Sequence, residues 1–437
     1  MKRTLLFIAV AAAISGCQVD SSDIQLAQAV PVSEQVQFNA TDTGLLIIDS
    51  QQSYVMDSDA FWTKVWYPDL PIPAENVDPQ LHQNIDRIAS LAKLANQLNF
   101  PTTITYEAYN TEWGLEYSPF ISRIEEALDE DTQVFFKQTF NATLETDIEN
   151  AMTSWLANGI NRVIVAGAET DVCVMQTVLG LKKMGFEVYL ASDATFSTEI
   201  YKRPTFKRLQ QAGVKLAATS EVLESMQAQD ELIYSPRYAV GNRAELHQAD
   251  RAQMAYINFN MDPTSINKAV HDNKTAVDYR LTSLGLEQEF LFQSLPSFHV
   301  NAKTEAYTDK YRQNADMIHH ERINQVIRDM RDMGKDQAMI SGVVSQKELI
   351  TTVVKLNSAQ ITPIILEDSL LGADVDPVHY LDLVYQLGAI PSTQKSNGYE
   401  MYVEVQLGDF SEDEKASYWQ MNGLQESVIP ELYPRLR

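Results

Sequence analysis

The sequence predicts an α/β protein in which helices flank a doubly wound parallel sheet, and it predicts that this unit occurs twice in tandem. In the first half, continuous apolar runs typical of strands buried on both faces alternate with segments of helical periodicity. In the second half, glycines recur at the spacing that they have in the first. The length of 437 residues suffices for two domains of ordinary size.

The elements of the first half follow one another as strand and helix in turn. Residues 43–48 (TGLLII) form a continuous apolar run, and residues 81–98 carry Ile85, Ile88 and Leu91 at helical spacing. Further strands are predicted at 102–106, 132–136, 163–166, 187–191 and 215–218, and further helices at 148–156 and 174–184. Gly159 and Gly185 come within three residues of the ends of these two helices, where glycine commonly ends a helix.

The second half repeats the spacing of the first. Four residues lie 175 positions (for example 334 − 159) after residues of the same type: Gly334 after Gly159, Gly342 after Gly167, Asp368 after Asp193 and Gly388 after Gly213. Apolar runs at 338–340 and 364–366 correspond to those at 163–165 and 189–191. We therefore expect one domain at 38–228 and a related domain at 245–437, joined near residues 227–243.

The N-terminus has the pattern of an export signal. Lys2 and Arg3 precede an apolar stretch at 5–14, and two small residues then precede Cys17. This pattern resembles the lipobox of bacterial lipoproteins, which implies a signal peptide at 1–16 and a lipid with palmitate-type acyl chains on Cys17. Gln18 in place of Asp implies sorting to the outer membrane, facing the periplasm of a Gram-negative cell. An ordinary secretory signal is the alternative, and residues 17–37 read as a flexible tether.

Charge and hydropathy restrict the partners. The formal net charge of −25 opposes binding to nucleic acid, whose phosphates carry the same sign. No second apolar stretch is long enough to span a bilayer, so we expect membrane attachment only through the N-terminal lipid.

Three chemically capable residues stand at strand ends in the first half. Asp49 follows the first strand, Lys137 the third, and Cys173 the fourth, where a helix is predicted to begin. The carboxyl ends of parallel strands share one edge of the sheet, where ligands bind. A helix N-terminus and an ammonium both stabilise a thiolate, and a carboxylate can accept the thiol proton. Singly, the three could instead be a helix cap, a solvated lysine and a small buried side chain.

The segments LLIIDSQ, FFKQTF and VIVAGAETDVCV together resemble the isochorismatase-like cysteine hydrolase superfamily, and the resemblance extends over residues 38–226. It implies an Asp49–Lys137–Cys173 triad, a cis peptide at Ala168–Glu169, and an oxyanion hole made by the N–H groups of Glu169 and Cys173. The implied reaction is attack of the thiolate on a small amide, or on a related C–N bond, through an acyl-enzyme.

The same resemblance bears on metals and oligomers. The nicotinamidase branch binds a metal through an Asp-x-His pair, and residues 105–117 (TYEAYNTEWGLEY) contain no histidine. We therefore expect no metal and no cofactor. The superfamily commonly oligomerises, so a homo-oligomer acting on a small-molecule substrate is expected.

Aromatic and acidic residues after the first two strands are candidates for the substrate pocket. They are Tyr54, Trp62, Trp66, Glu107 and Trp113. Such side chains line small-molecule pockets, but they could equally pack between subunits.

The second half departs from the pattern at the chemical positions. Asn258 replaces the aspartate and Glu348 the cysteine, while the lysine corresponds to Arg312, Lys303 or Lys310. We expect this copy to be inactive.

Three functions are compatible with the sequence. The first is a lipid-anchored amidase-type hydrolase. The second is a non-catalytic envelope lipoprotein that binds a small molecule or a protein partner. The third is a redox protein, which lacks a resolving cysteine because the chain has only two cysteines.

Overall fold

The computed structural model describes most of the chain between residues 32 and 401. The described residues are 32–34, 36–54, 80–111, 114–117, 119–197, 202–227, 232–234, 249–260, 265, 269, 295–301, 317–373 and 376–401. Cys17, Trp62, Trp66, Trp113, Lys303, Lys310 and Arg312 lie outside them. No helix within the described ranges combines the length and the apolar character needed to cross a membrane.

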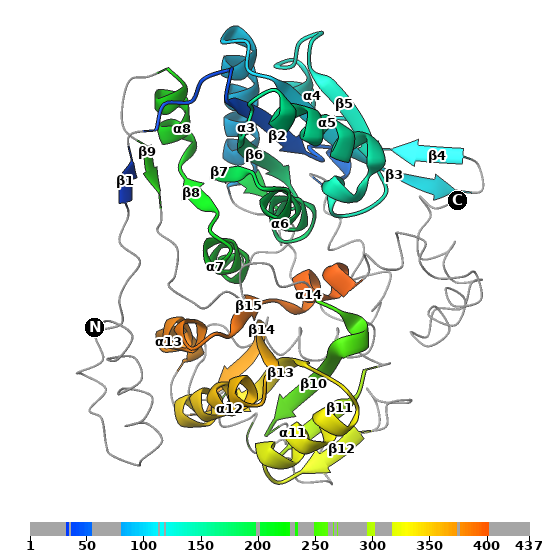
Figure 1. The fold of residues 1–437 in the computed structure, drawn as a ribbon, viewed down its shortest axis with the longest axis vertical. Coiled ribbons are helices and arrows are strands. Elements are labelled where there is room, and N and C mark those ends of the chain that lie inside the picture. Colours follow the sequence, from blue (N-terminus) through cyan, green and yellow to red (C-terminus); the bar gives the residue numbers. More distant parts are fainter. Residues whose placement is uncertain are drawn as a thin grey trace. The chain divides into compact units, whose positions relative to one another are not determined.

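The first sheet is doubly wound, which confirms the predicted fold class. Its parallel strands follow the order β5-β3-β2-β6-β7-β8, and β4 adds antiparallel to the far end of β3 (Figure 1). The strands are β2 (Thr43–Ile48), β3 (Thr102–Thr111), β4 (Gly114–Tyr117), β5 (Gln133–Lys137), β6 (Arg162–Ala168), β7 (Glu187–Phe196) and β8 (Lys215–Ala217). The strand order reverses direction between β2 and β6, and ligands of such sheets bind at this switch point.

Helices cover both faces of this sheet. They are α3 (Leu81–Gln97), α4 (Ser122–Glu125), α5 (Thr146–Ala157), α6 (Met175–Met184), α7 (Arg203–Gln211) and α8 (Thr219–Met226). One apolar cluster joins the sheet to α3 and α8, and a second joins it to α5, α6 and α7. Ile85, Ile88 and Leu91 of α3 are buried, as their spacing predicts.

Gly167 allows β6 to approach β2 closely at the switch point. Its φ is +121°, and a Cβ on it would lie 2.0 Å from the carbonyl oxygen of Ile48. Both the backbone angle and the contact exclude a larger side chain. The register of β6 on β7 also shifts beside this glycine, between Val165 and Gly167.

The second sheet is wholly parallel and has the order β12-β11-β10-β13-β14-β15. Its elements are β10 (Met254–Phe259), β11 (Ser297–Val300), β12 (Met317–His320), α11 (Ile323–Asp332), β13 (Gln337–Val344), α12 (Gln346–Ser358), β14 (Thr362–Gly372), α13 (Leu381–Gln386), β15 (Ile390–Ser392) and α14 (Gln394–Met401). If β4 is left out, the two sheets have the same topology: in each, the first strand along the chain is third in the sheet, the next two strands lie on one side of it and the last three on the other. Gly342 corresponds to Gly167, also with positive φ and beside a register shift.

The strand registers correct the expected correspondence of the chemical positions. Ile48 pairs with Gly167 in the first sheet, and Phe259 pairs with Gly342 in the second, so Asn260 corresponds to Asp49. Asn258, the residue expected from the sequence, lies two positions earlier.

The same registers locate the counterpart of Lys137. Thr105 pairs with Phe135 in the first sheet, as Val300 pairs with His320 in the second. Extending that register by two residues places Arg322, rather than Arg312, Lys303 or Lys310, at the lysine position.

The second sheet holds a carboxylate where the first holds the thiol. Glu348 lies as far beyond Gly342 as Cys173 lies beyond Gly167. Its two carboxylate oxygens accept hydrogen bonds from the side-chain amides of Asn260, at 3.0 Å, and Asn301, at 2.9 Å.

Other boundaries also differ from those expected. The strand β7 continues through Asp193, which had been expected after it, and this carboxylate pairs with Arg87 at 3.2 Å. The strand β1 (Val32–Glu34), at the end of the expected tether, pairs antiparallel with β9 (Leu232–Tyr234). The short helical turns are η1 (Gln52–Tyr54), η2 (Ala142–Leu144), η3 (Thr170–Val174), η4 (Arg251–Gln253) and η6 (Pro377–His379).

Candidate active site

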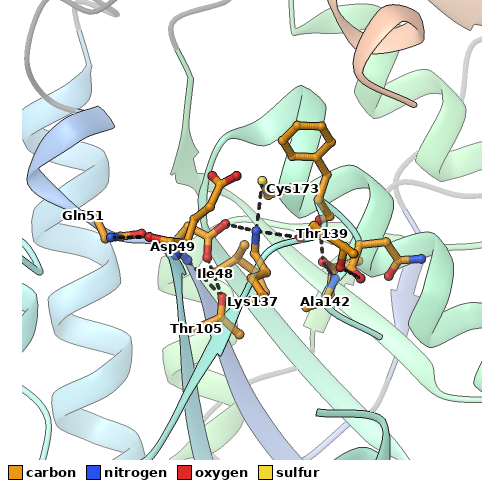
Figure 2. Close-up of polar contacts among 12 residues, drawn as sticks. Ile48, Asp49, Gln51, Thr105, Lys137, Thr139, Ala142 and Cys173 are labelled. Atoms are coloured by element: carbon orange, nitrogen blue, oxygen red, sulfur yellow. Dashed lines mark hydrogen bonds and ion pairs between the residues drawn. The ribbon is translucent and has the colours of Figure 1, made fainter. Parts of the chain in front are cut away.

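The three residues of the expected triad meet at the carboxyl edge of the first sheet. Asp49 directly follows β2, Lys137 is the last residue of β5, and Cys173 lies in the turn η3 between β6 and α6. Figure 2 shows Lys137 between the other two side chains. The sheet topology thus brings together residues that are up to 124 positions apart (173 − 49).

Lys137 contacts both partners at once. Its Nζ lies 2.7 Å from Oδ2 of Asp49 and 3.4 Å from Sγ of Cys173 (Figure 2). The ammonium also donates to the carbonyl oxygen of Thr139 at 3.0 Å, so three acceptors fix its position.

Backbone and side-chain bonds from β3 hold Asp49. Its φ of +39° is in the left-handed region, and its N–H donates to the carbonyl oxygen of Thr105 at 3.1 Å. The hydroxyl of Thr105 donates to Oδ1 at 2.8 Å. The two carboxylate oxygens therefore have different partners, because Thr105 binds one and Lys137 the other.

A second carboxylate, that of Glu107, lies beside the triad. Its backbone N–H donates to Oε1 of Gln51 at 2.7 Å, and Nε2 of Gln51 donates to its carbonyl oxygen at 3.1 Å. The hydroxyl of Tyr54 donates to its carboxylate. Tyr54 and Glu107 are thus joined, while Trp62 and Trp113 of the expected pocket lie outside the described residues.

Within the described part of the chain, Asp49, Glu107 and Cys173 form a group with the donor atoms to hold a metal ion. Their ligand atoms lie within 4.8 Å of one another. A metal ion bound there would face the Lys137 ammonium, which already supplies a positive charge to Asp49 and to the sulfur. The donor set fits a cation poorly for this reason.

The charges in this cluster determine the protonation of the thiol. Burial lowers the pKa of Lys137, but the negative charges of Asp49, Cys173 and Glu107 together outweigh it, and the net shift is upward. Burial raises the pKa of Cys173 well above its usual value; Lys137 opposes this, while Asp49 and Glu107 add to it. This balance favours the neutral thiol over the thiolate. The ammonium that favours a thiolate is thus opposed by burial and by the second carboxylate, which the sequence did not reveal.

The triad is closed to solvent. Asp49 and Lys137 are 0% exposed and Cys173 is 2% exposed. Cys173 packs in the apolar cluster under α5 and α6, which also contains Ile48 and Val172. A substrate must therefore displace covering groups to reach the sulfur.

The turn that carries the thiol has a distinctive backbone. The Ala168–Glu169 peptide is cis, the carbonyl oxygen of Glu169 accepts from the N–H of Val174 at 3.1 Å, and Asp171 is fully buried.

Several residues that hold the site were not found from the sequence. Gln51, Thr105 and Thr139 act through backbone groups or through one hydroxyl, and no local sequence pattern distinguishes such contacts. Glu107 had been expected only as a pocket wall.

Part of the chain is similar to known proteins. Residues 43–221 match the family model of the isochorismatase domain. A secreted isochorismatase effector, Isc1, of Phytophthora sojae is 30% identical over 148 residues, which are 33% of this chain and 66% of that protein. Isochorismatase family protein 2B of Dictyostelium discoideum is 28% identical over 155 residues, covering 33% of this chain and 72% of that protein.

Among solved structures, the YcaC gene product of Escherichia coli, described as an octameric hydrolase of unknown specificity, is 22% identical with a TM-score of 0.35. That match covers 45% of this chain and 85% of the other.

The fold and the matched residues define the class. Residues 43–221 are an isochorismatase-like domain. This part of the chain is similar to isochorismatase domains, and the match spans just under two thirds of the Phytophthora relative.

Proposed function

We propose that the chain is a cysteine hydrolase that cleaves a small amide, or a related C–N bond, with Asp49, Lys137 and Cys173. The observation that supports it most strongly is the position of the Lys137 ammonium, in contact with the carboxylate at 2.7 Å and with the sulfur at 3.4 Å. A nucleophile beside an acid–base group and an orienting cation is the arrangement that covalent catalysis requires.

The first half of the reaction forms the acyl-enzyme. Because the resting thiol is neutral, the proton of Cys173 passes to Asp49 as Sγ attacks the carbonyl carbon. Lys137 stabilises the negative charge that develops on sulfur. The backbone N–H groups of Glu169 and Cys173 donate to the oxyanion. The C–N bond then breaks, and the amine leaves with the proton held by Asp49.

The second half reverses these roles. Asp49 removes a proton from water, the water oxygen attacks the thioester carbon, and the C–S bond breaks. The thiol recovers the proton, and the carboxylic acid product leaves.

The test is to trap the acyl-enzyme. Wild type and the variants Cys173→Ala and Cys173→Ser are mixed with a panel of small amides, and both intact mass and turnover are followed. We expect turnover and an acyl adduct on Cys173 in wild type only. Equal turnover in wild type and Cys173→Ala would exclude this function.

A non-catalytic envelope lipoprotein that binds a small molecule or a protein partner is the second candidate. The closed triad favours it, since Cys173 is only 2% exposed. A thiol that resists every small alkylating agent in the folded protein would support this candidate over the hydrolase.

We further propose that Cys17 carries a lipid that holds the protein on the periplasmic face of the outer membrane. The support is the charged, apolar and small-residue pattern before Cys17. Palmitate labelling and membrane fractionation test it, and a Cys17→Ala variant that still incorporates palmitate would contradict it.

We also propose that the second sheet and its helices are a duplicate of the first domain that has no catalytic activity. The common strand order and the replacement of aspartate and thiol by Asn260 and Glu348 support this. A homo-oligomer is expected on the family resemblance, and light scattering of the purified protein tests it.

A further inference from the structure

A lysine from the second sheet's last helix reaches the turn that carries the thiol. Nζ of Lys395, in α14, lies 3.0 Å from Oε1 of Glu169 and 3.7 Å from Oδ2 of Asp171. It also lies 3.4 Å from the hydroxyl of Ser197, which itself donates to Asp171. The side chains of Lys395, Glu169 and Asp171 are 14%, 12% and 0% exposed, so these charges are largely removed from water.

This ammonium compensates two negative charges within the turn. Glu169 and Asp171 are two positions apart, and both precede Cys173. Burial raises the pKa of Asp171, Lys395 lowers it, and the neighbouring Glu169 raises it again. Without the ammonium, two like charges would face each other in a poorly hydrated turn, which favours protonation or displacement of one of them.

Other contacts fix the helix that presents Lys395. Arg208 of α7 donates through one guanidinium nitrogen to Oε2 of Glu400 at 2.8 Å, and a second ion pair joins the same two nearly fully buried side chains. The rings of Phe140 and Tyr399 meet edge to face at 5.0 Å between centroids. These contacts hold α14 in place, so the backbone position of Lys395 does not depend on its own side chain.

We propose that Lys395 is a positioning residue of the active site, and that the second copy supplies it to hold the Glu169–Cys173 turn in its reactive conformation. This inference rests on the proposed hydrolase function, because the turn provides both the nucleophile and the N–H groups for the oxyanion. It gives the inactive copy a role in the reaction of the other copy.

The test uses variants of the full chain. Lys395→Met removes the charge, Lys395→Arg keeps it, and the double variant Lys395→Met/Glu169→Gln removes the two opposite charges together. Lys347→Met, on an exposed position of α12, is the matched control. The probe is p-nitrophenyl acetate, and the acetylation rate of Cys173 is followed by mass spectrometry of its peptide.

We expect Lys395→Met to slow acetylation by roughly 100-fold, the usual effect of a misplacement of about 1 Å. Lys395→Arg and Lys347→Met should stay near wild type, and the double variant should recover at least about tenfold over Lys395→Met, because the two sites are coupled. Lys395→Met at the wild-type rate would overturn the inference. A double variant as slow as Lys395→Met would also overturn the inference. Removing the charge of Glu169 cannot repair a general loss of packing, so such a result would point to packing rather than to charge compensation.

Failure of the proposed function is distinguishable from failure of this inference. If wild-type Cys173 is not acetylated at all, the hydrolase proposal fails, and hydrogen exchange of the backbone at residues 169–174 then tests the contact alone. Faster exchange in Lys395→Met than in Lys395→Arg supports the positioning role, and equal exchange in the two contradicts it.

Discussion

Asp49 has two effects on the sulfur that a single substitution separates. In the proposed mechanism it is the base that removes the thiol proton. Burial raises the pKa of Cys173, and the negative charge of Asp49 raises it further, as does that of Glu107. Asp49→Asn removes the base and the charge while keeping the shape of the side chain. We therefore expect turnover to fall and simple alkylation of the thiol to become faster.

The size of the second effect follows from the distances. The ligand atoms of Asp49 and Cys173 lie within 4.8 Å of each other. With an effective dielectric constant of about 20, two unit charges at that separation repel by about 3.5 kcal/mol, so the charge of Asp49 disfavours the thiolate. The thiol pKa should therefore fall in Asp49→Asn. Thiolate nucleophilicity decreases with pKa, with a coefficient near 0.5, so alkylation at pH 7 should rise roughly 15-fold.

The assay compares iodoacetamide alkylation of the Cys173 peptide with amide turnover, both at pH 7. Loss of general acid–base catalysis should lower turnover by about 10²- to 10⁴-fold. Asp147→Asn, an exposed substitution in the first turn of α5, is the control for charge removal alone. Slower alkylation in Asp49→Asn, with an unchanged circular dichroism spectrum, would refute the electrostatic reasoning, and unchanged turnover would refute the assignment of the base.

Three further substitutions test the site and its surroundings. Lys137→Met removes the charge that lowers the thiol pKa, so alkylation at pH 7 should slow by at least about tenfold, with its pH profile shifted upward. Gly167→Ala should cost about 2 kcal/mol or more, seen as a lower melting temperature. Gly185→Ala, with φ of +100° and no atom within 4 Å, should cost less, and equal losses would contradict the contact argument. Arg208→Met should cost about 3–5 kcal/mol in urea unfolding by leaving Glu400 buried without its guanidinium, and adding Glu400→Gln should restore part of the stability; a double variant no better than the single one would contradict this.

The sequence was sufficient for the fold of the first half and for the meeting of the triad. Each of Asp49, Lys137 and Cys173 follows an apolar run, and a parallel sheet brings the ends of such runs to one edge. What brings the three residues together is the topology of the sheet, and the alternation of strands and helices in the sequence already predicts that topology.

The sequence was insufficient for the correspondence in the second sheet. Taking Asn258 rather than Asn260 as the counterpart of Asp49 is an error of two positions, which leaves every side chain on the same face of its strand. The hydrophobic pattern therefore cannot detect the slip, whereas the hydrogen-bonded register does.

Long-range polar contacts were also beyond sequence reasoning. Lys395 meets Glu169 across 226 positions, and nothing in the residues around Lys395 marks it as a partner of the thiol turn. The two factors that oppose the thiolate, burial and the charge of Glu107, escaped sequence reasoning for a related reason, because both appear only when the strands are assembled.

The carboxylate of Glu348 has a consequence for any compound that reaches the second sheet. Both of its oxygens already accept hydrogen bonds from amide groups, those of Asn260 and Asn301, and neither amide ionises near neutral pH. An electrophile there would meet hard oxygen atoms engaged in a fixed network, with no cysteine thiol to attack it. The edge beside Glu348 therefore differs in chemistry from the edge with Cys173, where the state of the thiol depends on a balance of charges and burial.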